Sequence, residues 1–258
     1  MVAEFSLLLT CGISLIWCLM PRAQVTAGFF RIQMLLVMGL SALGVLAMGQ
    51  LTSGSGDPLS STLLFRARVF SSIAIGFAYF GSIAWTLDRR PVGTWAMVGI
   101  LGATLISLIC SRGATMGLTT SAGAFHLLSS FSTAFLLGAA VTGMLLGHWY
   151  LTAPTMSIEP LKTLCWYFAA AVLLRFLVSL SGWMIAGDEL HRGLHWTWFS
   201  LRWLAGILGP MAISIMALRI LRYRNTQAAT GVLFAGVILC FIGEMSAALL
   251  YSELRASF

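Results

Sequence analysis

The chain has 258 residues, of which 59% are hydrophobic and only 9% are charged. In soluble domains about a quarter of the residues are charged. This composition, with a mean hydropathy of +0.93, therefore excludes a soluble protein and indicates an integral membrane protein. The net charge of +7 does not indicate nucleic-acid binding, because no basic run is longer than Arg89-Arg90.

The N-terminal apolar run is predicted to be a retained first helix. The N-terminus has Glu4 and has no lysine or arginine before the apolar run. Pro21-Arg22 follows the run in place of a signal-peptide cleavage site. The five cysteines lie in or beside apolar runs without CxxC or CxxCH spacing. This pattern excludes a thioredoxin-like motif and a c-type haem attachment site.

Eight apolar runs follow one another along the chain, each long enough to cross about 30 Å of hydrocarbon as a helix. Backbone exposed to lipid must satisfy its hydrogen bonds internally, and the runs lack strand alternation. The sequence therefore predicts an all-α, polytopic integral membrane helix bundle with about eight transmembrane helices, in a single transmembrane domain over 1–258. The predicted spans are 3–20, 29–49, 63–87, 93–110, 123–149, 160–186, 196–223 and 230–251.

Eight spans place both termini on one side of the membrane. Positively charged loops stay in the cytoplasm, and the side opposite the termini has eight basic residues against six. Both termini are thus predicted to be extracytoplasmic, in a plasma (inner) membrane. The eight residues are Arg22, Arg31, Arg89, Arg90, Lys162, Arg219, Arg222 and Arg224.

Five charged side chains lie inside the predicted spans, where a central charge costs about 2.5–3.5 kcal/mol. The topology places all five in the outer half of the bundle or at its midplane, and we expect them to face the interior and to have partners. Arginines outnumber acidic residues there, even with Asp188 and Glu189 of the nearby loop included, which predicts a bound anion. The five are Arg66, Arg68, Arg175, Arg202 and Glu244.

For two of these arginines the sequence leaves an alternative open. Arg66 and Arg68 lie near the start of the third span, and long basic side chains near a span end can extend to the lipid headgroups. Arg175 lies near the middle of the sixth span, where that alternative is weaker.

Three histidines are candidate ligands. His126 lies at the outer end of the fifth span, and His191 and His195 lie in the loop between the sixth and seventh spans. His126 together with His191 or His195 can supply two axial imidazoles to a b-type haem, whose propionates would meet the arginines. The predicted metal ligands are His126 and His195. The alternative is that the loop histidines are solvated.

Small residues predict two local features of the helices. Gly206, Gly209 and Pro210 near the middle of the seventh span predict a kink, because proline lacks the amide and clashes with the preceding turn. Gly143 and Gly147 form a GxxxG pattern, which permits close helix approach.

Three functions remain, and whether the protein is an enzyme stays open because the common catalytic motifs are absent. An electron-transfer-type membrane subunit with a b-type haem or quinone in the outer half accounts for the histidines and the arginines together. A permease for a small anionic solute accounts for Arg175, Glu244 and the kink. A structural or assembly subunit requires no chemistry from them. The predicted partners are the lipid bilayer, other membrane subunits and an extracytoplasmic redox partner, and no nucleic acid.

Overall fold

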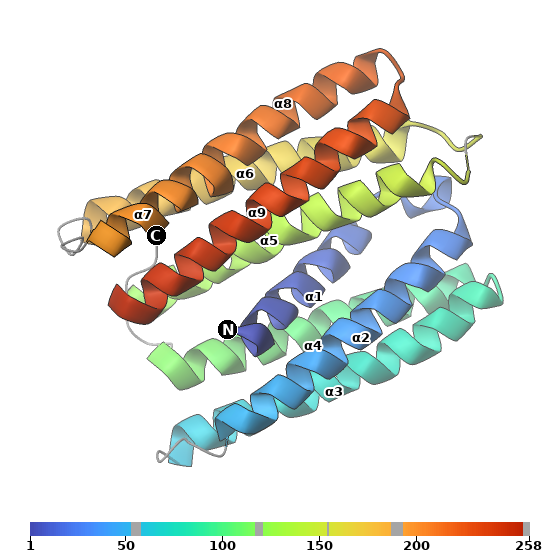
Figure 1. Cartoon of the computed structure of the whole chain (residues 1–258). Coiled ribbons are helices and arrows are strands. Elements are labelled where there is room, and N and C mark those ends of the chain that lie inside the picture. Colours follow the sequence, from blue (N-terminus) through green and yellow to red (C-terminus); the bar gives the residue numbers. More distant parts are fainter. Residues whose placement is uncertain (53–57, 117–120, 154, 187–192, 255–258) are drawn as a thin grey trace. The chain divides into compact units, whose positions relative to one another are not determined.

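The structure is a computed structural model that describes residues 1–52, 58–116, 121–153, 155–186 and 193–254 (Figure 1). Within these ranges the chain is helical and has no strand, which confirms the predicted all-α fold class. Eight helical segments are long and apolar enough to cross a membrane, and these confirm the number of predicted spans: Val2–Leu19, Ala27–Gly49, Leu59–Thr86, Arg90–Ala114, Ala122–Trp149, Glu159–Ile185, Gly193–Arg222 and Thr226–Glu253.

The chain divides into two compact units, Met1–Ala134 and Phe135–Phe258, with the boundary inside one helix. Whether the two form the predicted single domain stays a prediction. Many large apolar side chains are exposed, among them Trp95 and Leu46 at 74% and 70%. In water such a surface would be unfavourable, so these faces contact lipid and the protein is a multi-pass membrane protein.

Unit 1 is built around packing of its first four long helices. Helix α3 packs against α2 and α4, and α1 packs against the same two helices. The central helix contacts include a hydrogen bond between the hydroxyls of Ser71 on α3 and Ser107 on α4, at 2.8 Å, and Ser107 also donates to the carbonyl of Ala67 at 2.8 Å. The elements are α1 (Val2–Leu19), η1 (Arg22–Gln24), α2 (Ala27–Thr52), α3 (Pro58–Thr86), α4 (Arg90–Met116) and the first part of α5 (Ser121–Trp149).

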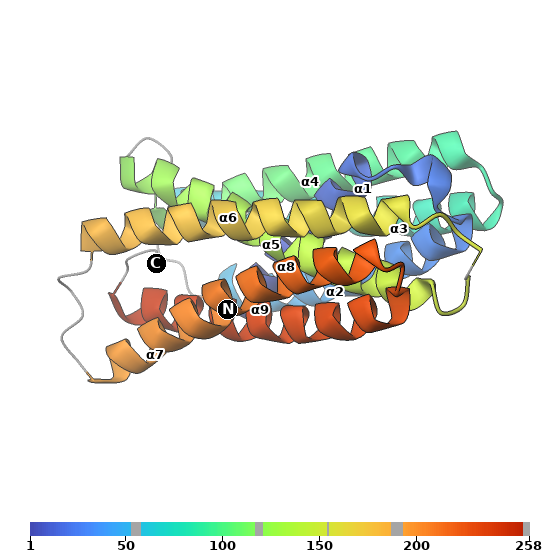
Figure 2. The ribbon, with the colours of Figure 1, turned by 90° about the horizontal axis from the view of Figure 1, so that it is seen from above.

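Unit 2 holds the rest of α5 and the helices that follow it. Helix α9 packs against α7, η3 and α8, and α6 packs against α8. Figure 2 shows α7 continuing into α8 as one long, interrupted rod. The elements are α6 (Glu159–Ala186), α7 (Gly193–Trp203), the π-helical turn η3 (Leu204–Leu208), α8 (Gly209–Arg222) and α9 (Thr226–Leu254).

The interruption of the seventh span lies where glycine and proline predicted a kink. Pro210 lies in the first turn of α8, has no amide to donate, and its ring crowds the carbonyl four residues earlier. The chain accommodates this with the π-helical turn η3, a form that is rare and frequent at functional sites.

Two glycine contacts bring the helices of unit 2 close together. A Cβ on Gly243 of α9 would lie 2.0 Å from the Cα of Gly206 of η3, so the two backbones touch. A Cβ on Gly147 would lie 2.6 Å from Oγ1 of Thr230 on α9. The first contact was not predicted, and the second agrees with the GxxxG prediction at Gly147.

Candidate functional site: the charge cluster and helix α7 of unit 2

Three charged side chains and a serine meet inside unit 2, and we call Arg175, Ser179, Arg202 and Glu244 the charge cluster. Arg175 of α6 donates from Nε to Oε1 of Glu244 at 2.9 Å and from Nη2 to Oε2 at 3.0 Å. Arg202 of α7 donates from Nη1 to Oε1 of Glu244 at 2.8 Å and from Nη2 to Oγ of Ser179 at 2.8 Å. One carboxylate of α9 thus joins α6 to α7.

The charge cluster is buried and carries an excess positive charge. Arg202 is 0% exposed, Arg175 3% and Glu244 6%. Among the residues that the structure describes, two guanidinium groups and one carboxylate leave a net charge of +1, away from water. Buried charges are tolerated only when they are paired and hydrogen-bonded, and the remaining charge favours a ligand that is anionic or rich in acceptor oxygens.

Local sequence explains how these side chains meet. Ser179 follows Arg175 by four residues, so both lie on one face of α6. Gly243 precedes Glu244 on α9, and its contact with Gly206 brings the two backbones together one turn after Arg202. With a larger residue at either glycine, α7 and α9 would lie further apart and the contact of Arg202 with the carboxylate would weaken.

Helix α7 and its end concentrate polar atoms that are buried without a hydrogen-bond partner in the described part of the chain. These atoms are Nδ1 of His195, Nε of Arg202 and Nε1 of Trp203. An unsatisfied buried polar atom costs about 1–3 kcal/mol, and native proteins contain few. Three within nine residues mark a position where a ligand with hydrogen-bonding oxygens would be stabilised.

Aromatic rings surround this part of α7. We call Phe176, Trp183, Trp196, Phe199 and Trp203 the aromatic cluster, because each ring centroid lies within 6.1 Å of that of another member. His195 lies against Trp198 at 6.4 Å between centroids. Such rings offer flat apolar surfaces, and tryptophans are also common at membrane interfaces.

The position of His195 corrects one prediction. The sequence placed His195 in the loop before the seventh span, whereas it lies in α7 and is 5% exposed. The span begins at Gly193, three residues earlier than predicted, because polar residues around the loop obscured the helix start. The solvated alternative is therefore wrong for His195, whereas Asp188 and His191 lie outside the described residues.

The remaining predicted site residues belong to unit 1. Arg66 and Arg68 of α3 are exposed, so they do not face the interior, and their exposure agrees with the alternative left open for these two, in which they extend to the headgroups. The guanidinium of Arg68 lies against Gly49 near the end of α2. His126 is 7% exposed in α5, and Ser130 donates to its backbone carbonyl at 2.8 Å.

Metal binding by His126 and His195 stays a prediction. Within the described ranges, no three side chains among histidine, cysteine, aspartate and glutamate are arranged to hold a metal ion. A haem iron needs only two axial histidines, so this arrangement does not decide between haem and its alternatives. The two histidines belong to different units, each of which is described by itself.

Sequence reasoning missed two partners. Ser179 could have been found from its spacing of four residues after Arg175. Arg112 of α4 forms an ion pair with Glu4 of α1, and the arginine side chain is 9% exposed against 40% for the glutamate. Opposite charges at helix ends on the same predicted side of the membrane were the available signal.

The comparisons with known proteins give no family. No family model matches the chain, and neither a curated protein nor a solved structure matches it.

Proposed function

We propose that the protein is an electron-transfer-type membrane subunit that holds a quinone or a b-type haem along α7, beside the charge cluster. The observation that carries the proposal is the group of three buried polar atoms on His195, Arg202 and Trp203 that have no hydrogen-bond partner among the described residues. Quinone carbonyls and haem propionates are acceptors, which suits the guanidinium and indole donors.

The charge cluster supports the same proposal. Its net charge of +1 would favour the acceptor oxygens of a quinone or the propionates of a haem, since guanidinium binds oxygen anions strongly. Arg202 follows His195 by seven residues, which is two helical turns, so the histidine and the cluster share one face of α7 about 10 Å apart. A ring-shaped cofactor of ordinary size could contact both.

An absorption spectrum and a quinone titration of the purified full chain test the proposal. A haem subunit would show a Soret band and split α and β bands after reduction with dithionite. A quinone subunit would instead show saturable quenching of tryptophan fluorescence by a short-chain benzoquinone. His195→Gln should remove the haem bands, or weaken quinone binding about tenfold, the equivalent of one buried hydrogen bond.

The matched control is His148→Gln, because His148 is an exposed histidine of α5. It should leave both signals unchanged. Folded protein with neither haem bands nor saturable quinone quenching would contradict the proposal, as would equal losses in the two variants.

A permease for a small anionic solute is the second candidate, and the interruption η3 beside the charge cluster favours it. A broken helix next to buried arginines suits a site that opens alternately to the two sides. Uptake of radiolabelled anions into proteoliposomes, with Arg175→Gln as the test variant, separates this candidate from the first. Unchanged uptake in that variant would remove Arg175 from any transport mechanism.

We also propose the orientation given by the basic loops, with both termini and the α6–α7 connection outside a plasma (inner) membrane. In that orientation the cofactor would be accessible to an extracytoplasmic redox partner. Labelling single cysteines with a membrane-impermeant maleimide tests it. A cysteine at exposed Ser252 near the end of α9 should react in intact cells, and one at exposed Arg224 should react only after lysis.

A further inference from the structure

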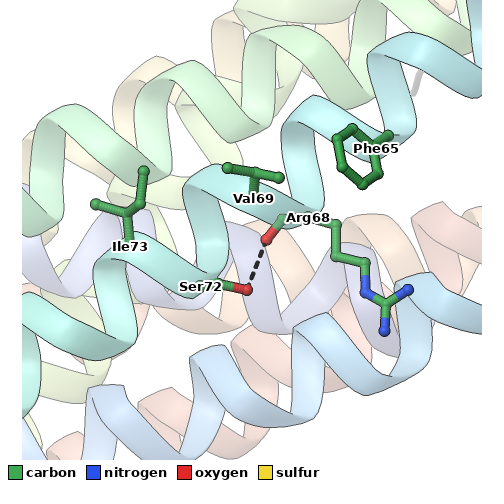
Figure 3. Close-up of a pocket in the computed structure, with 5 residues that line it drawn as sticks. All are labelled: Phe65, Arg68, Val69, Ser72 and Ile73. Atoms are coloured by element: carbon green, nitrogen blue, oxygen red, sulfur yellow. Dashed lines mark hydrogen bonds between the residues drawn. The ribbon is translucent and has the colours of Figure 1, made fainter.

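One face of α3 in unit 1 forms a shallow depression of about 390 Å³. Its lining residues repeat at intervals of three and four, so they form one stripe along the helix. Figure 3 shows the side chains of Val69 and Ile73 in a row and the guanidinium of Arg68 reaching away from them. We call Phe65, Arg68, Val69, Ser72 and Ile73 the α3 stripe.

The α3 stripe faces the surroundings of the protein. Phe65 is 62% exposed, Val69 40% and Ile73 42%, and all three lie in the span Leu59–Thr86. In a helix that crosses a bilayer, exposed apolar side chains contact acyl chains. The depression therefore opens toward lipid.

The length of α3 places the guanidinium of Arg68 within reach of the headgroups. The 28-residue span is about 42 Å long, which exceeds about 30 Å of hydrocarbon by roughly 6 Å at each end. Arg68 is nine residues after Leu59, and its side chain is directed back toward the helix N-terminus, which is the near surface. Its contact with Gly49, three residues before α2 ends, agrees with this level.

No carboxylate neutralises Arg68 among the residues that the structure describes. Arg66, two residues earlier on α3, is exposed as well, so this end of the helix presents two positive charges. A cation at the headgroup level attracts anionic lipid, and each arginine near the membrane surface contributes about fivefold in affinity.

We propose that the α3 stripe binds one anionic phospholipid, with its phosphate on Arg68 and one acyl chain along Val69 and Ile73. The position of the apolar residues favours a lipid over a free anion. Val69 and Ile73 lie further from the helix N-terminus than Arg68, so the apolar part of the stripe runs from the guanidinium toward the middle of the membrane. The hydroxyl of Ser72 donates to the backbone carbonyl of Arg68 at 3.0 Å, and it adds an exposed polar atom to the stripe.

Native mass spectrometry of the full chain in detergent, titrated with phosphatidylglycerol and with phosphatidylcholine of identical acyl chains, tests the proposal. We expect one phosphatidylglycerol to bind at least fivefold more tightly than phosphatidylcholine, and Arg68→Gln to remove that preference. Arg66→Gln is the matched control, because it removes the same charge two residues away, from a residue that lies near Cys110 of α4 and outside the stripe. It should weaken phosphatidylglycerol binding less than Arg68→Gln does and leave a preference for phosphatidylglycerol over phosphatidylcholine.

A second variant tests the acyl-chain part without changing charge. Val69→Trp fills the depression at an exposed position and should weaken phosphatidylglycerol binding severalfold. Equal losses in Arg66→Gln and Arg68→Gln would overturn the proposal, as would equal binding of the two lipids or normal binding by Val69→Trp. Displacement of the lipid by an equal concentration of inorganic phosphate would also overturn it, since the site would then be one for a free anion.

Discussion

Arg68 of unit 1 and Arg202 of unit 2 occupy equivalent positions in their spans but lie in opposite environments. Each lies nine residues after the first residue of its span, Leu59 or Gly193, about 14 Å along the helix. In both helices the Cα–Cβ bond is tilted toward the helix N-terminus. Arg68 is nevertheless exposed, whereas Arg202 is 0% exposed and bonded to Glu244.

The neighbouring helix makes the difference. Helix α9 presents Glu244 directly after Gly243, where its backbone touches Gly206, so Arg202 meets a carboxylate at contact distance. Helix α2 presents Gly49 to Arg68, a close surface without a charge. Depth and residue type therefore do not decide whether an arginine in a span is buried, and the residue facing it does.

Removing the carboxylate of Glu244 should have the largest effect on the difference between Arg202 and Arg68. Glu244→Gln leaves the buried guanidinium groups of Arg175 and Arg202 without a counter-charge, and removing one partner of a buried ion pair costs about 3–5 kcal/mol. We expect a loss of that size in the free energy of unfolding, measured by circular dichroism during titration with sodium dodecyl sulfate.

Two further variants define the origin of this loss. Glu253→Gln changes an exposed glutamate of the same helix and should change the free energy by less than about 0.5 kcal/mol. Replacing Arg175, Arg202 and Glu244 together by methionine should recover most of the stability, because apolar replacement of a whole buried cluster is often neutral. Equal effects of the two glutamine variants would show that the charge of Glu244 contributes nothing.

The second prediction separates the helix contact from the charges. Gly243→Ala places a Cβ 2.0 Å from the backbone of Gly206, and backbone cannot move aside as a flexible side chain does. We expect a loss of about 1–3 kcal/mol from overpacking and a weaker contact between Arg202 and Glu244. Thermal unfolding in detergent measures the first effect.

Gly231→Ala on the same helix is the control for that substitution, since no atom lies within 4 Å of the added Cβ. It should be neutral or stabilising by up to about 1 kcal/mol, because alanine favours helix over glycine. A Gly243→Ala protein as stable as Gly231→Ala would mean that the contact does not hold α9 against η3.

The contrast between Arg68 and Arg202 also shows how far the sequence could lead. Run length and apolar composition were sufficient for all eight spans, because a helix that crosses lipid needs little else. The cost of a buried charge correctly predicted partners for Arg175 and Arg202. The same argument left two alternatives open for Arg66 and Arg68, because the residue facing an arginine belongs to another helix and depends on helix packing.

Helix packing also explains what was missed at the charge cluster. Gly206 was interpreted only as part of a kink, and Gly243 had no assigned role, although together they set the distance between Arg202 and Glu244. Neither glycine indicates its partner by local spacing, because they are 37 positions apart in the sequence. The sequence also could not predict which buried polar atoms on α7 lack a hydrogen-bond partner among the described residues, since hydrogen bonding of a side chain depends on its surroundings.

The third prediction concerns a half-buried ion pair, whose exposure lies between that of Arg68 and that of Arg202. Arg112 is buried and Glu4 is 40% exposed, so solvent screens the pair and removing its carboxylate costs less than at Glu244. Glu4→Gln should lower the free energy of unfolding by about 1 kcal/mol, and 1 M salt should reduce the difference from the unmodified protein. An effect as large as that of Glu244→Gln would contradict the role assigned to burial.

The last prediction tests burial without charge, at a residue outside the spans. Tyr150 is 4% exposed and donates from its hydroxyl to the carbonyl of Ser157. Burial, aided by nearby Glu159 and opposed by a backbone hydrogen bond at Leu161, raises its pKa from 10.0 to about 12.

The folded protein therefore favours the neutral phenol of Tyr150. This stabilisation is fully present below pH 10 and is lost as the pH rises toward 12, because the unfolded state ionises first. Tyr150→Phe should cost about 0.5–1 kcal/mol at pH 8. A rise of two pKa units corresponds to about 2.7 kcal/mol, so the melting temperatures of the two proteins should converge above pH 10 and cross before pH 12, where the phenylalanine protein becomes the more stable one. A difference that does not change with pH over that range would mean that the phenol is accessible to water in the folded state.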